Sequence, residues 1–277
     1  TRAADYEIGR IKSAAHLSDK RMLKAVSVDD GWALATVEML KANAGLSDSE
    51  IDPWKVGLYV GAPPSTPFDN ENYFEAMAES RKPDGCCDEV KFGELCMDAR
   101  PTTLLLGLPN NVLCYGAIIM NAMGPNSNYT SAETSGQLAV LNGARRLQYG
   151  KIDMAVVGGF SSHTEPVIRS MLEQNDVLMR ESSGSSAFAI DPQAQTPEGT
   201  IVADGAAFFT LERRAAAVAR KGADKILATY VGRATASEAC GGLGRMNERP
   251  ALIDAVKQCL ESAQVGPEQV GIVFTSA

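Results

Sequence analysis

A helix, a short loop containing acidic residues and a proline, and an apolar strand occur in the same order at two places in the chain. In the first copy, helix 27–45 and its loop lead into the run KVGLYVGA. In the second, Pro250 opens the helical stretch ALIDAVKQCLESA, and the loop after it leads into VGIVFTSA. Such a repeat is the signature of an internal duplication. Two copies can also arise by chance in an α/β protein, so the repeat alone does not prove one.

Further helical and strand patterns alternate between these two copies. Helix 134–149 precedes the unalternating apolar run KIDMAVVGGF, which predicts a strand covered on both faces. A strand at 204–212 then leads into a short basic helix that ends at Gly222. This order predicts helices packed over mainly parallel or mixed sheets. The ranges 61–100 and 181–200 show little periodicity and are predicted to be loops or insertions.

The first helix has clear boundaries. Ser27 is the expected N-cap, acidic residues follow in the first turn, and Gly45 is the expected stop. The positions predicted to form its apolar face are Trp32, Leu34, Val37, Met39 and Leu40.

Composition excludes several classes of function. A net charge of −8 argues against nucleic-acid binding, which needs a surplus of Lys and Arg. No apolar run is long enough to cross a bilayer and no leader pattern is present, so we expect a cytoplasmic protein without a membrane partner. The six cysteines lack C-x-x-C spacing and the two histidines lie far apart, so neither a metal site nor a cofactor is expected. The adjacent Cys86 and Cys87 could form a bridge, although free thiols are the simpler interpretation.

The stretch NSNYTSAETSGQLAV, at 126–140, resembles a turn that presents a nucleophile at the head of a helix. Small residues flank Glu133, and the helix that follows offers unpaired amides and a positive dipole end. A cysteine there would have a lowered pKa and act as a nucleophile. A carboxylate there is stabilised as an anion and is a poor catalyst of acyl transfer. The simpler alternative is an acidic residue in the first turn of a surface helix.

The surrounding sequence resembles the β-ketoacyl synthase family of the thiolase superfamily. The matching pieces are Pro109-Asn110-Asn111 before a helix, Gly124-Pro125 before a strand, SAETSG where the family has T-A-C-x-S, ARRLQYGKIDMAVVGG after it, and ADGAAFF where the family has G-E-G-A. The first repeat copy is similar to the family's third helix and strand, and the second copy to the equivalent pair in its second half. The resemblance therefore covers nearly all of the chain from about residue 20.

The resemblance implies a thiolase-like layered α/β fold (α/β/α/β/α) built from two duplicated halves. The expected division is 1–195 for the N-terminal half with its loop insertions and 196–277 for part of the C-terminal half. The family's first strand and its two histidine motifs have no counterpart in the printed sequence, so the fold is expected to be incomplete at both ends. His16 and His163 lie outside the positions of those motifs.

The main departure from the family is Glu133 at the position of the catalytic cysteine. This departure implies a catalytically silent subunit, most like the chain length factor of a type II polyketide synthase. By resemblance it would form a heterodimer with an active ketosynthase, complete the acyl tunnel and control chain length. Its other partner would be an acyl carrier protein that bears a phosphopantetheine-linked chain.

The resemblance also suggests which residues serve each role. The family's dimer strand corresponds to Asn126, Ser127, Asn128, Tyr129, Thr130 and Ser131. Positions similar to tunnel-lining ones are Thr103, Leu106, Leu108, Tyr115 and Ile118, for each of which ordinary core packing is the alternative.

Two alternative functions differ in class. The subunit could decarboxylate malonyl-ACP, as loading ketosynthases do, but those proteins commonly have Gln at this point, and ionised Glu cannot donate a hydrogen bond. It could also be a non-enzymatic acyl-binding scaffold. A carrier protein is usually acidic, and local basic patches could attract it. The candidates for such patches, otherwise solvated helix faces, are Arg145, Arg146, Lys151, Arg213, Arg214, Arg220 and Lys221.

Overall fold

The computed structural model describes residues 12–46, 51–63, 71–96, 103–161, 163–178, 199–237 and 250–274. The chain divides into two compact units. The sheet unit consists of Glu7–Arg169 and Ala203–Arg213, and the C-terminal unit of Thr1–Tyr6, Ser170–Val202 and Arg214–Ala277. The division expected near residue 195 falls outside the described residues, so that boundary stays a prediction.

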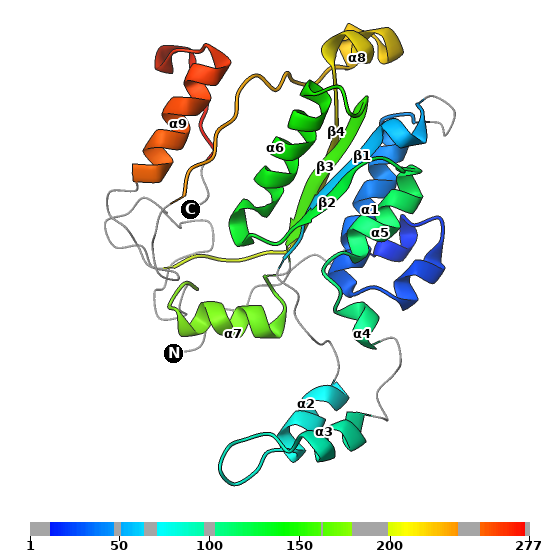
Figure 1. Cartoon of the computed structure of the whole chain (residues 1–277), viewed down its shortest axis with the longest axis vertical. Helices are drawn as coiled ribbons and strands as arrows, with labels where there is room; N and C mark the ends of the chain where they lie inside the picture. Colours follow the sequence, from blue (N-terminus) through cyan, green and yellow to red (C-terminus); the bar gives the residue numbers. More distant parts are fainter. Residues whose placement is uncertain are drawn as a thin grey trace. The chain divides into compact units, whose positions relative to one another are not determined.

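The sheet unit is built on a four-stranded mixed sheet with the order β2-β1-β3-β4 (Figure 1). The strands are β1 (Val56–Gly61), β2 (Asn126–Tyr129), β3 (Met154–Ser161) and β4 (Gly205–Glu212). β1 runs parallel to β2 and β3, and β4 is antiparallel to β3. The predicted strands at 55–62, 151–160 and 204–212 are therefore confirmed, as is the mixed sheet.

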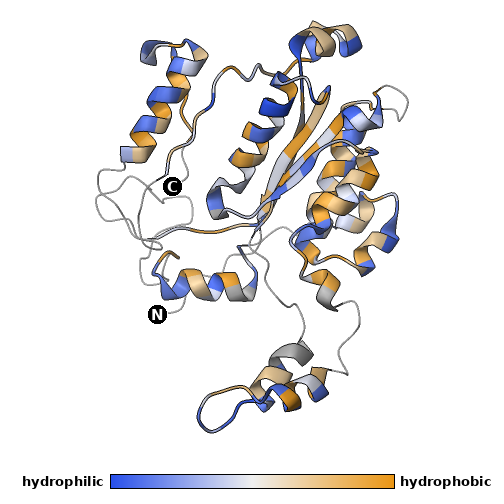
Figure 2. Cartoon of the chain, viewed as in Figure 1, coloured by the Kyte–Doolittle hydropathy of each residue, from blue (hydrophilic) through white to orange (hydrophobic). Residues whose placement is uncertain are grey.

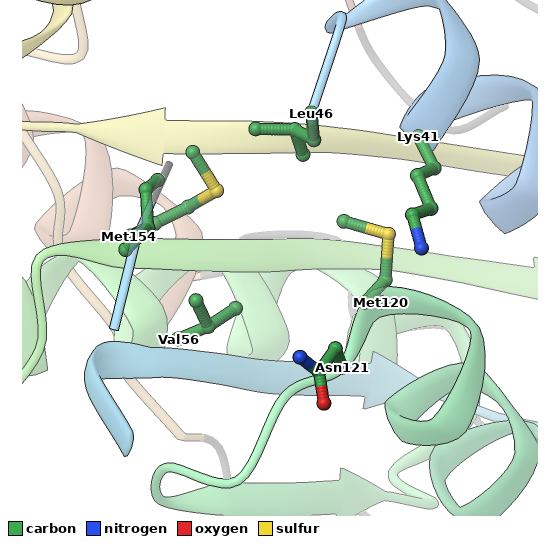
Figure 3. Close-up of a pocket in the computed structure, with 7 residues that line it drawn as sticks. Lys41, Leu46, Val56, Met120, Asn121 and Met154 are labelled. Carbon is green, nitrogen blue, oxygen red and sulfur yellow. The ribbon is translucent and has the colours of Figure 1, made fainter. Parts of the chain in front are cut away.

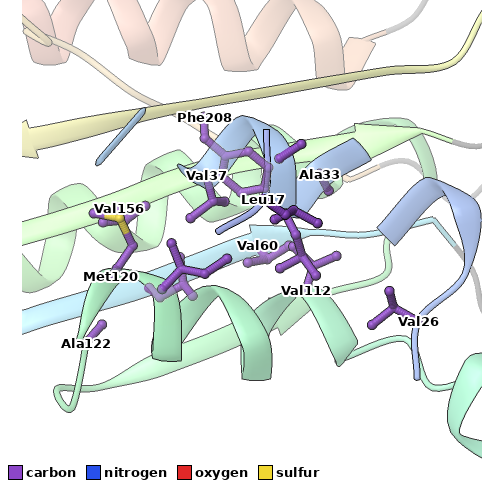
Figure 4. Close-up of a cluster of buried hydrophobic side chains, with 14 of the residues drawn as sticks. Leu17, Val26, Ala33, Val37, Val60, Val112, Met120, Ala122, Val156 and Phe208 are labelled. Atoms are coloured by element: carbon purple, nitrogen blue, oxygen red, sulfur yellow. The ribbon is translucent and has the colours of Figure 1, made fainter. Parts of the chain in front are cut away.

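Helices cover both faces of this sheet. α6 (Ser135–Gln148) packs on one face, and α1 (Val28–Asn43) and α5 (Asn111–Met120) pack together on the other (Figure 1). The larger apolar core lies between α1, α5 and the sheet (Figure 4). Its fully buried members include Leu34, Val60, Val112 and Val156. β1 and the first part of β3 are buried on both faces, which explains their unalternating apolar sequences.

α1 begins and ends where its sequence predicts. The hydroxyl of Ser27 accepts a hydrogen bond from the backbone N–H of Asp30, and the carboxylate of Asp30 accepts one from the N–H of Ser27, which forms a capping box. Gly45 has a φ of 56° just beyond the helix. The predicted apolar face was partly wrong, because Met39 is exposed. The buried residues of α1 also include the small residues Gly31, Ala33 and Ala35.

α6 approaches the sheet through a stripe of small residues. Its buried residues are Ser135, Ala139, Gly143 and Leu147, which recur every fourth position. A Cβ on Gly143 would lie 2.5 Å from Cγ1 of Val157, so no larger residue fits there. Figure 2 shows both hydrophobic and hydrophilic bands on α6, as expected for a helix with one buried and one exposed face.

The range 61–100 was predicted to be a loop, and this was wrong in part. It contains α2 (Glu71–Glu79) and α3 (Glu89–Cys96), which pack against each other and are linked by an antiparallel bridge between Arg81 and Cys87. Asp88 helps to start α3 by accepting a hydrogen bond from the N–H of Lys91, 3.1 Å away. Cys86 and Cys87 are free, exposed thiols, as the simpler interpretation held.

Shorter elements complete the described part of the chain. α4 (Thr103–Leu106) precedes α5, and α7 (Pro166–Gln174) follows β3. Short 3₁₀ helices are η1 (Ser13–Ala15), η2 (Lys20–Lys24), η3 (Pro53–Lys55), η4 (Ala132–Thr134), η7 (Ala223–Lys225) and η8 (Pro267–Gln269). Among the described helices, none combines the length and the apolar character that a bilayer crossing requires.

The C-terminal unit contains α8 (Arg214–Lys221) and α9 (Pro250–Ala263), both close to the predicted helices. The repeat extends to local structure, because η3 before β1 and η8 after α9 both begin with a proline. The strand expected after η8 is absent from the described residues, where 270–274 is irregular and Phe274 is 91% exposed. A strand forms only when it can pair, and no described strand lies in this unit.

Candidate functional site

The candidate site lies at the edge of the sheet where the parallel strands end. β1, β2 and β3 end there with Gly61, Tyr129 and Ser161, and α6 begins at the same edge. Ligands of α/β folds commonly bind outside the carboxyl ends of parallel strands. Glu133 lies at this edge, in the 3₁₀ turn η4 that joins β2 to α6.

Hydrogen bonds within the turn hold its backbone in place. The N–H of Ser131 donates to Oγ of Ser135 at 2.8 Å. Oγ1 of Thr134 donates to the carbonyl of Ser131, also at 2.8 Å. The small polar residues around Glu133 therefore bond to one another, while the Glu133 side chain is exposed. The turn fixes the position of residue 133 and leaves its side chain outside the core.

Close packing of glycines brings the start of α6 onto the strand ends. A Cβ on Gly61 would lie only 2.4 Å from the backbone N of Gly136, and one on Gly159 would lie 3.3 Å from Cα of Gly136. The first amides of α6 are thus placed against the ends of β1 and β3. The turn that carries Glu133, directly before α6, is therefore also placed at the strand ends.

The predicted dimer strand is an edge strand of the described sheet. β2 spans Asn126–Tyr129 and pairs with β1 on one side only, while Thr130 and Ser131 lead into η4. Asn126, Thr130 and Ser131 are exposed, and the other three predicted interface residues are partly buried. An edge strand has unpaired N–H and C=O groups that another chain can use. The interface role itself stays a prediction.

The predicted tunnel residues differ in their surroundings. Tyr115 packs against the larger core and Leu106 is partly buried. Leu108 and Ile118 are 42% and 66% exposed, respectively. Thr103 lies in α4, and its side chain is outside the described atoms. Their role as tunnel wall therefore stays a prediction.

A small pocket is present where β1 and β3 begin, at the other end of these strands from Glu133 (Figure 3). Val56 and Met154, at the starts of β1 and β3, contribute to it, and its free volume is about 20 Å³, roughly enough for one water molecule. Its remaining lining residues are Lys41, Leu46, Ile51, Met120 and Asn121. It is too small for an acyl chain and far from Glu133 along the strands.

The family described as β-ketoacyl synthase, N-terminal domain, matches residues 7–217. This chain belongs to the β-ketoacyl synthase family. A Streptomyces violaceoruber relative, named as the granaticin polyketide β-ketoacyl synthase 1, is 24% identical over 242 residues, which are 87% of this chain and 55% of that protein. The chain spans about half the length of the curated polyketide relatives it matches.

Solved structures show the fold of this β-ketoacyl synthase family member. The ishigamide ketosynthase/chain length factor superposes with a TM-score of 0.73 at 17% identity, over 95% of this chain and 59% of that chain. A type II polyketide synthase ketosynthase in complex with its acyl carrier protein, AntDE:AntF, gives a TM-score of 0.55 at 17% identity, over 78% of this chain and 55% of that chain. The expected thiolase-like fold is therefore confirmed.

The hydrogen bonds of three polar residues were not predicted from the sequence. Asp30 is buried in α1, and burial raises the pKa of its carboxyl group above the ordinary value. It accepts a hydrogen bond of 3.1 Å from Nδ2 of Asn111. Asn128, on β2, donates to the carbonyl of Pro109 at 3.0 Å. These bonds join segments far apart in sequence, so no local pattern predicts them.

The basic residues considered for carrier-protein docking do not act alike. Nη2 of Arg213 lies 2.5 Å from Oδ1 of Asp153, and Nη1 donates to the carbonyl of Leu147 at 3.3 Å, so Arg213 caps the end of α6. Arg145, Arg146 and Lys151 are exposed in the sheet unit. Arg214, Arg220 and Lys221 lie on α8 in the other unit. The hypothesis of a docking patch is best restricted to the exposed residues near the end of α6.

Proposed function

We propose that this chain is a catalytically silent ketosynthase-like subunit of a type II polyketide synthase, similar to a chain length factor. It pairs with an active ketosynthase, completes the acyl tunnel and controls the length of the polyketide. The active partner supplies the nucleophile, and an acyl carrier protein delivers the growing chain. The relatives named as polyketide synthases and the similarity to a ketosynthase/chain length factor support this assignment.

The observation that carries the proposal is Glu133 at the head of α6. Condensing enzymes of the family need a cysteine thiolate there to hold the acyl chain as a thioester, whereas the side chain of Glu133 is a carboxyl group. Such a group does not form the acyl thioester. The turn around it has the small residues and hydrogen bonds that would position a nucleophile, but a glutamate stands at the position itself.

The edge position of β2 supports the choice of partner. Asn126–Tyr129 offers an unpaired strand edge within the described sheet, directly before the turn that carries Glu133. Pairing through this edge would bring a second ketosynthase-like chain next to the candidate site. The similar structures include a ketosynthase in complex with an acyl carrier protein, which supports a carrier protein as the second partner.

Co-expression with candidate ketosynthases, followed by purification and product profiling, tests this function. We expect a one-to-one heterodimer that makes polyketides of defined length. Enlarging Thr103 to Trp should shorten the product and trimming Tyr115 to Ala should lengthen it, because bulk in the tunnel wall replaces volume for product. A chain that remains a monomer or homodimer beside every candidate, or unchanged product length in both variants, contradicts the proposal.

The same preparation separates the alternative functions. A malonyl-ACP decarboxylase would release CO₂ from malonyl-ACP without the ketosynthase, and Glu133→Gln would raise that activity because Gln can donate a hydrogen bond and lacks the repelling charge. A binding scaffold would retain acyl chains with neither partner nor reaction. Both results differ from a complex that is active only as a heterodimer.

A further inference from the structure

The segment Leu105–Pro109 spans the end of α4 and the turn that leads to α5, and it contains Leu106 and Leu108, two of the predicted tunnel positions. We call it the 105–109 segment. Within it the N–H of Leu108 donates to the carbonyl of Leu105 at 3.2 Å, and two side chains from neighbouring positions also bond to its carbonyl groups.

The first such side chain is Asn111, at the start of α5. Its Nδ2 donates to the carbonyl of Leu105 at 2.8 Å and to Oδ2 of Asp30 at 3.1 Å. Asn111 and Asp30 are both 5% exposed. One buried amide thus ties the beginning of the 105–109 segment to the capped N-terminus of α1. Bonds to a carboxylate are stronger than neutral ones, which fixes the orientation of this amide.

The second is Asn128, on the edge strand β2. Its Nδ2 donates to the carbonyl of Pro109 at 3.0 Å, at the end of the 105–109 segment. Side chains alternate along a strand, and Tyr129 next to it packs with the α6 side of the sheet. Asn128 therefore faces the side that carries α5, which contacts β2. This bond joins the predicted dimer strand directly to the predicted tunnel wall.

Packing alone does not explain an asparagine at position 128. Its Oδ1 is buried and has no hydrogen-bond partner among the described residues. A buried acceptor without a partner is destabilising, so an apolar side chain of similar size would serve a purely structural position better. What the amide contributes and an apolar residue cannot is the bond to Pro109.

We propose that Asn111 and Asn128 are positioning residues that latch the 105–109 segment at both ends and thereby set the wall of the acyl tunnel. Through Asn128 the wall is coupled to the strand that meets the partner ketosynthase. The role in chain length rests on the proposed function, whereas the latch itself is a property of this chain. Neither asparagine touches the reacting atoms.

Hydrogen exchange of this chain tests the latch. In Asn128→Leu, which keeps the volume and removes the donor, the amides of Leu106, Gly107 and Leu108 should exchange about tenfold faster, the factor expected for loss of one bond. Asn110→Leu is the matched control, because Asn110 is exposed and its amide donates to Sγ of Cys114, at 3.6 Å, rather than to the 105–109 segment. Exchange in Asn128→Leu equal to that in the control would overturn the latch.

Asn111→Leu is a second variant, with the larger effect expected because it also leaves Asp30 without its amide donor. If this variant fails to fold, Asn128→Leu still decides the question. Asn128→Leu removes the unpaired Oδ1 but also leaves the Pro109 carbonyl without its donor, so these effects offset each other and its unfolding free energy should stay close to that of the wild type. Faster exchange in a chain that is no less stable identifies local loosening of the segment.

Product profiling of the heterodimer tests the consequence for chain length. In the heterodimer that it forms, Asn128→Leu should yield a broader range of product lengths than wild type, and Asn110→Leu should not. If Thr103→Trp changes product length and Asn128→Leu does not, the positioning role is overturned and the proposed function stands. If no heterodimer forms, or Thr103→Trp also has no effect, the proposed function fails and the positioning role falls with it.

Discussion

Residue 133 lies in a turn whose backbone is held without its side chain. The turn at Ala132–Thr134 is held by the bonds between Ser131, Thr134 and Ser135, none of which involves the Glu133 side chain. The residue at this position can therefore vary without disturbing the turn. The position itself, at the start of α6, keeps the electrostatic properties of a helix N-terminus.

The substitution Glu133→Cys should therefore create an unusually reactive thiol. The helix N-terminus stabilises thiolate over thiol, so at pH 7 the introduced cysteine should react with iodoacetamide about tenfold faster than an ordinary exposed cysteine. Peptide-resolved mass spectrometry of a time course measures this rate, with Cys86 of the same chain as the internal reference. Equal rates for the two thiols would show that the turn does not activate residue 133.

Asp30 provides a second prediction at the residue scale. Burial raises the pKa of its carboxyl group above 3.8, so the folded chain holds this proton more tightly than the unfolded chain does. As the pH rises through the interval between the unfolded and the folded pKa, the folded state therefore loses stability. Asp30 therefore contributes most to the stability of the folded state at pH values below that interval.

Unfolding by urea at a series of pH values from about 4 to about 8 measures this dependence. The stability of wild type relative to Asp30→Asn should fall with rising pH, by at most about 1.4 kcal/mol per pH unit within the interval. Glu38→Gln, on the same helix, controls for the loss of one carboxyl group. A stability difference that does not change with pH would contradict the assignment of a raised pKa to Asp30.

At the scale of elements, the contact between β1 and α6 decides where the candidate site lies. The two glycines at this contact differ in their surroundings, because a Cβ on Gly61 would overlap the backbone of α6, whereas one on Gly136 would meet no atom within 4 Å. The end of β1 therefore has no room for a side chain at position 61, whereas the start of α6 has room for one at position 136.

Substitution of these two glycines by alanine should therefore have opposite effects. Gly61→Ala should lower the unfolding free energy by about 1–3 kcal/mol, because it forces α6 away from the strand. Gly136→Ala should raise it by up to about 1 kcal/mol through the greater helix propensity of alanine. Chemical denaturation of both variants measures the pair. A destabilising Gly136→Ala would mean that the first turn of α6 is more crowded than the structure shows.

At the scale of the whole molecule, the chain exposes much apolar surface. Ile272, Val273 and Phe274 are all more than 70% exposed in the C-terminal unit, and the chain spans about half the length of its curated polyketide relatives. In the proposed heterodimer, the partner chain would bind the unpaired edge of β2, which does not include these three residues. Binding to the folded state alone stabilises a protein in proportion to the logarithm of free partner concentration.

A partner ketosynthase should therefore raise the unfolding temperature of this chain. Above the dissociation constant, each tenfold increase in free partner adds about 1.4 kcal/mol to the apparent stability. Differential scanning fluorimetry over a range of partner concentrations measures the effect, and a chain with Ser127→Pro in β2 serves as the control. A melting temperature independent of partner concentration would count against the heterodimer.

Local patterns in the sequence predicted the elements that depend on local interactions. The capping residues of α1, the glycine after α8 and the apolar runs of β1 and β3 are readable because caps and side-chain periodicity act over a few residues. The position of Glu133 at the head of a helix was readable for the same reason. The short helices α2 and α3 were missed because turn-forming residues dominate that stretch.

Tertiary structure alone decided which segments meet. Asn128 bonds to a carbonyl 19 residues away and Asn111 to a carboxylate 81 residues away, and neither has a local signature. The run after η8 has the composition of a strand and forms none in the described residues, because a strand needs a neighbour to pair with. Local chemistry thus determined most of the helices, the strands β1, β3 and β4, and the position of Glu133 at the head of a helix. The order of the strands, the edge position of β2 and the amide bonds on the 105–109 segment depend on packing between distant parts of the chain.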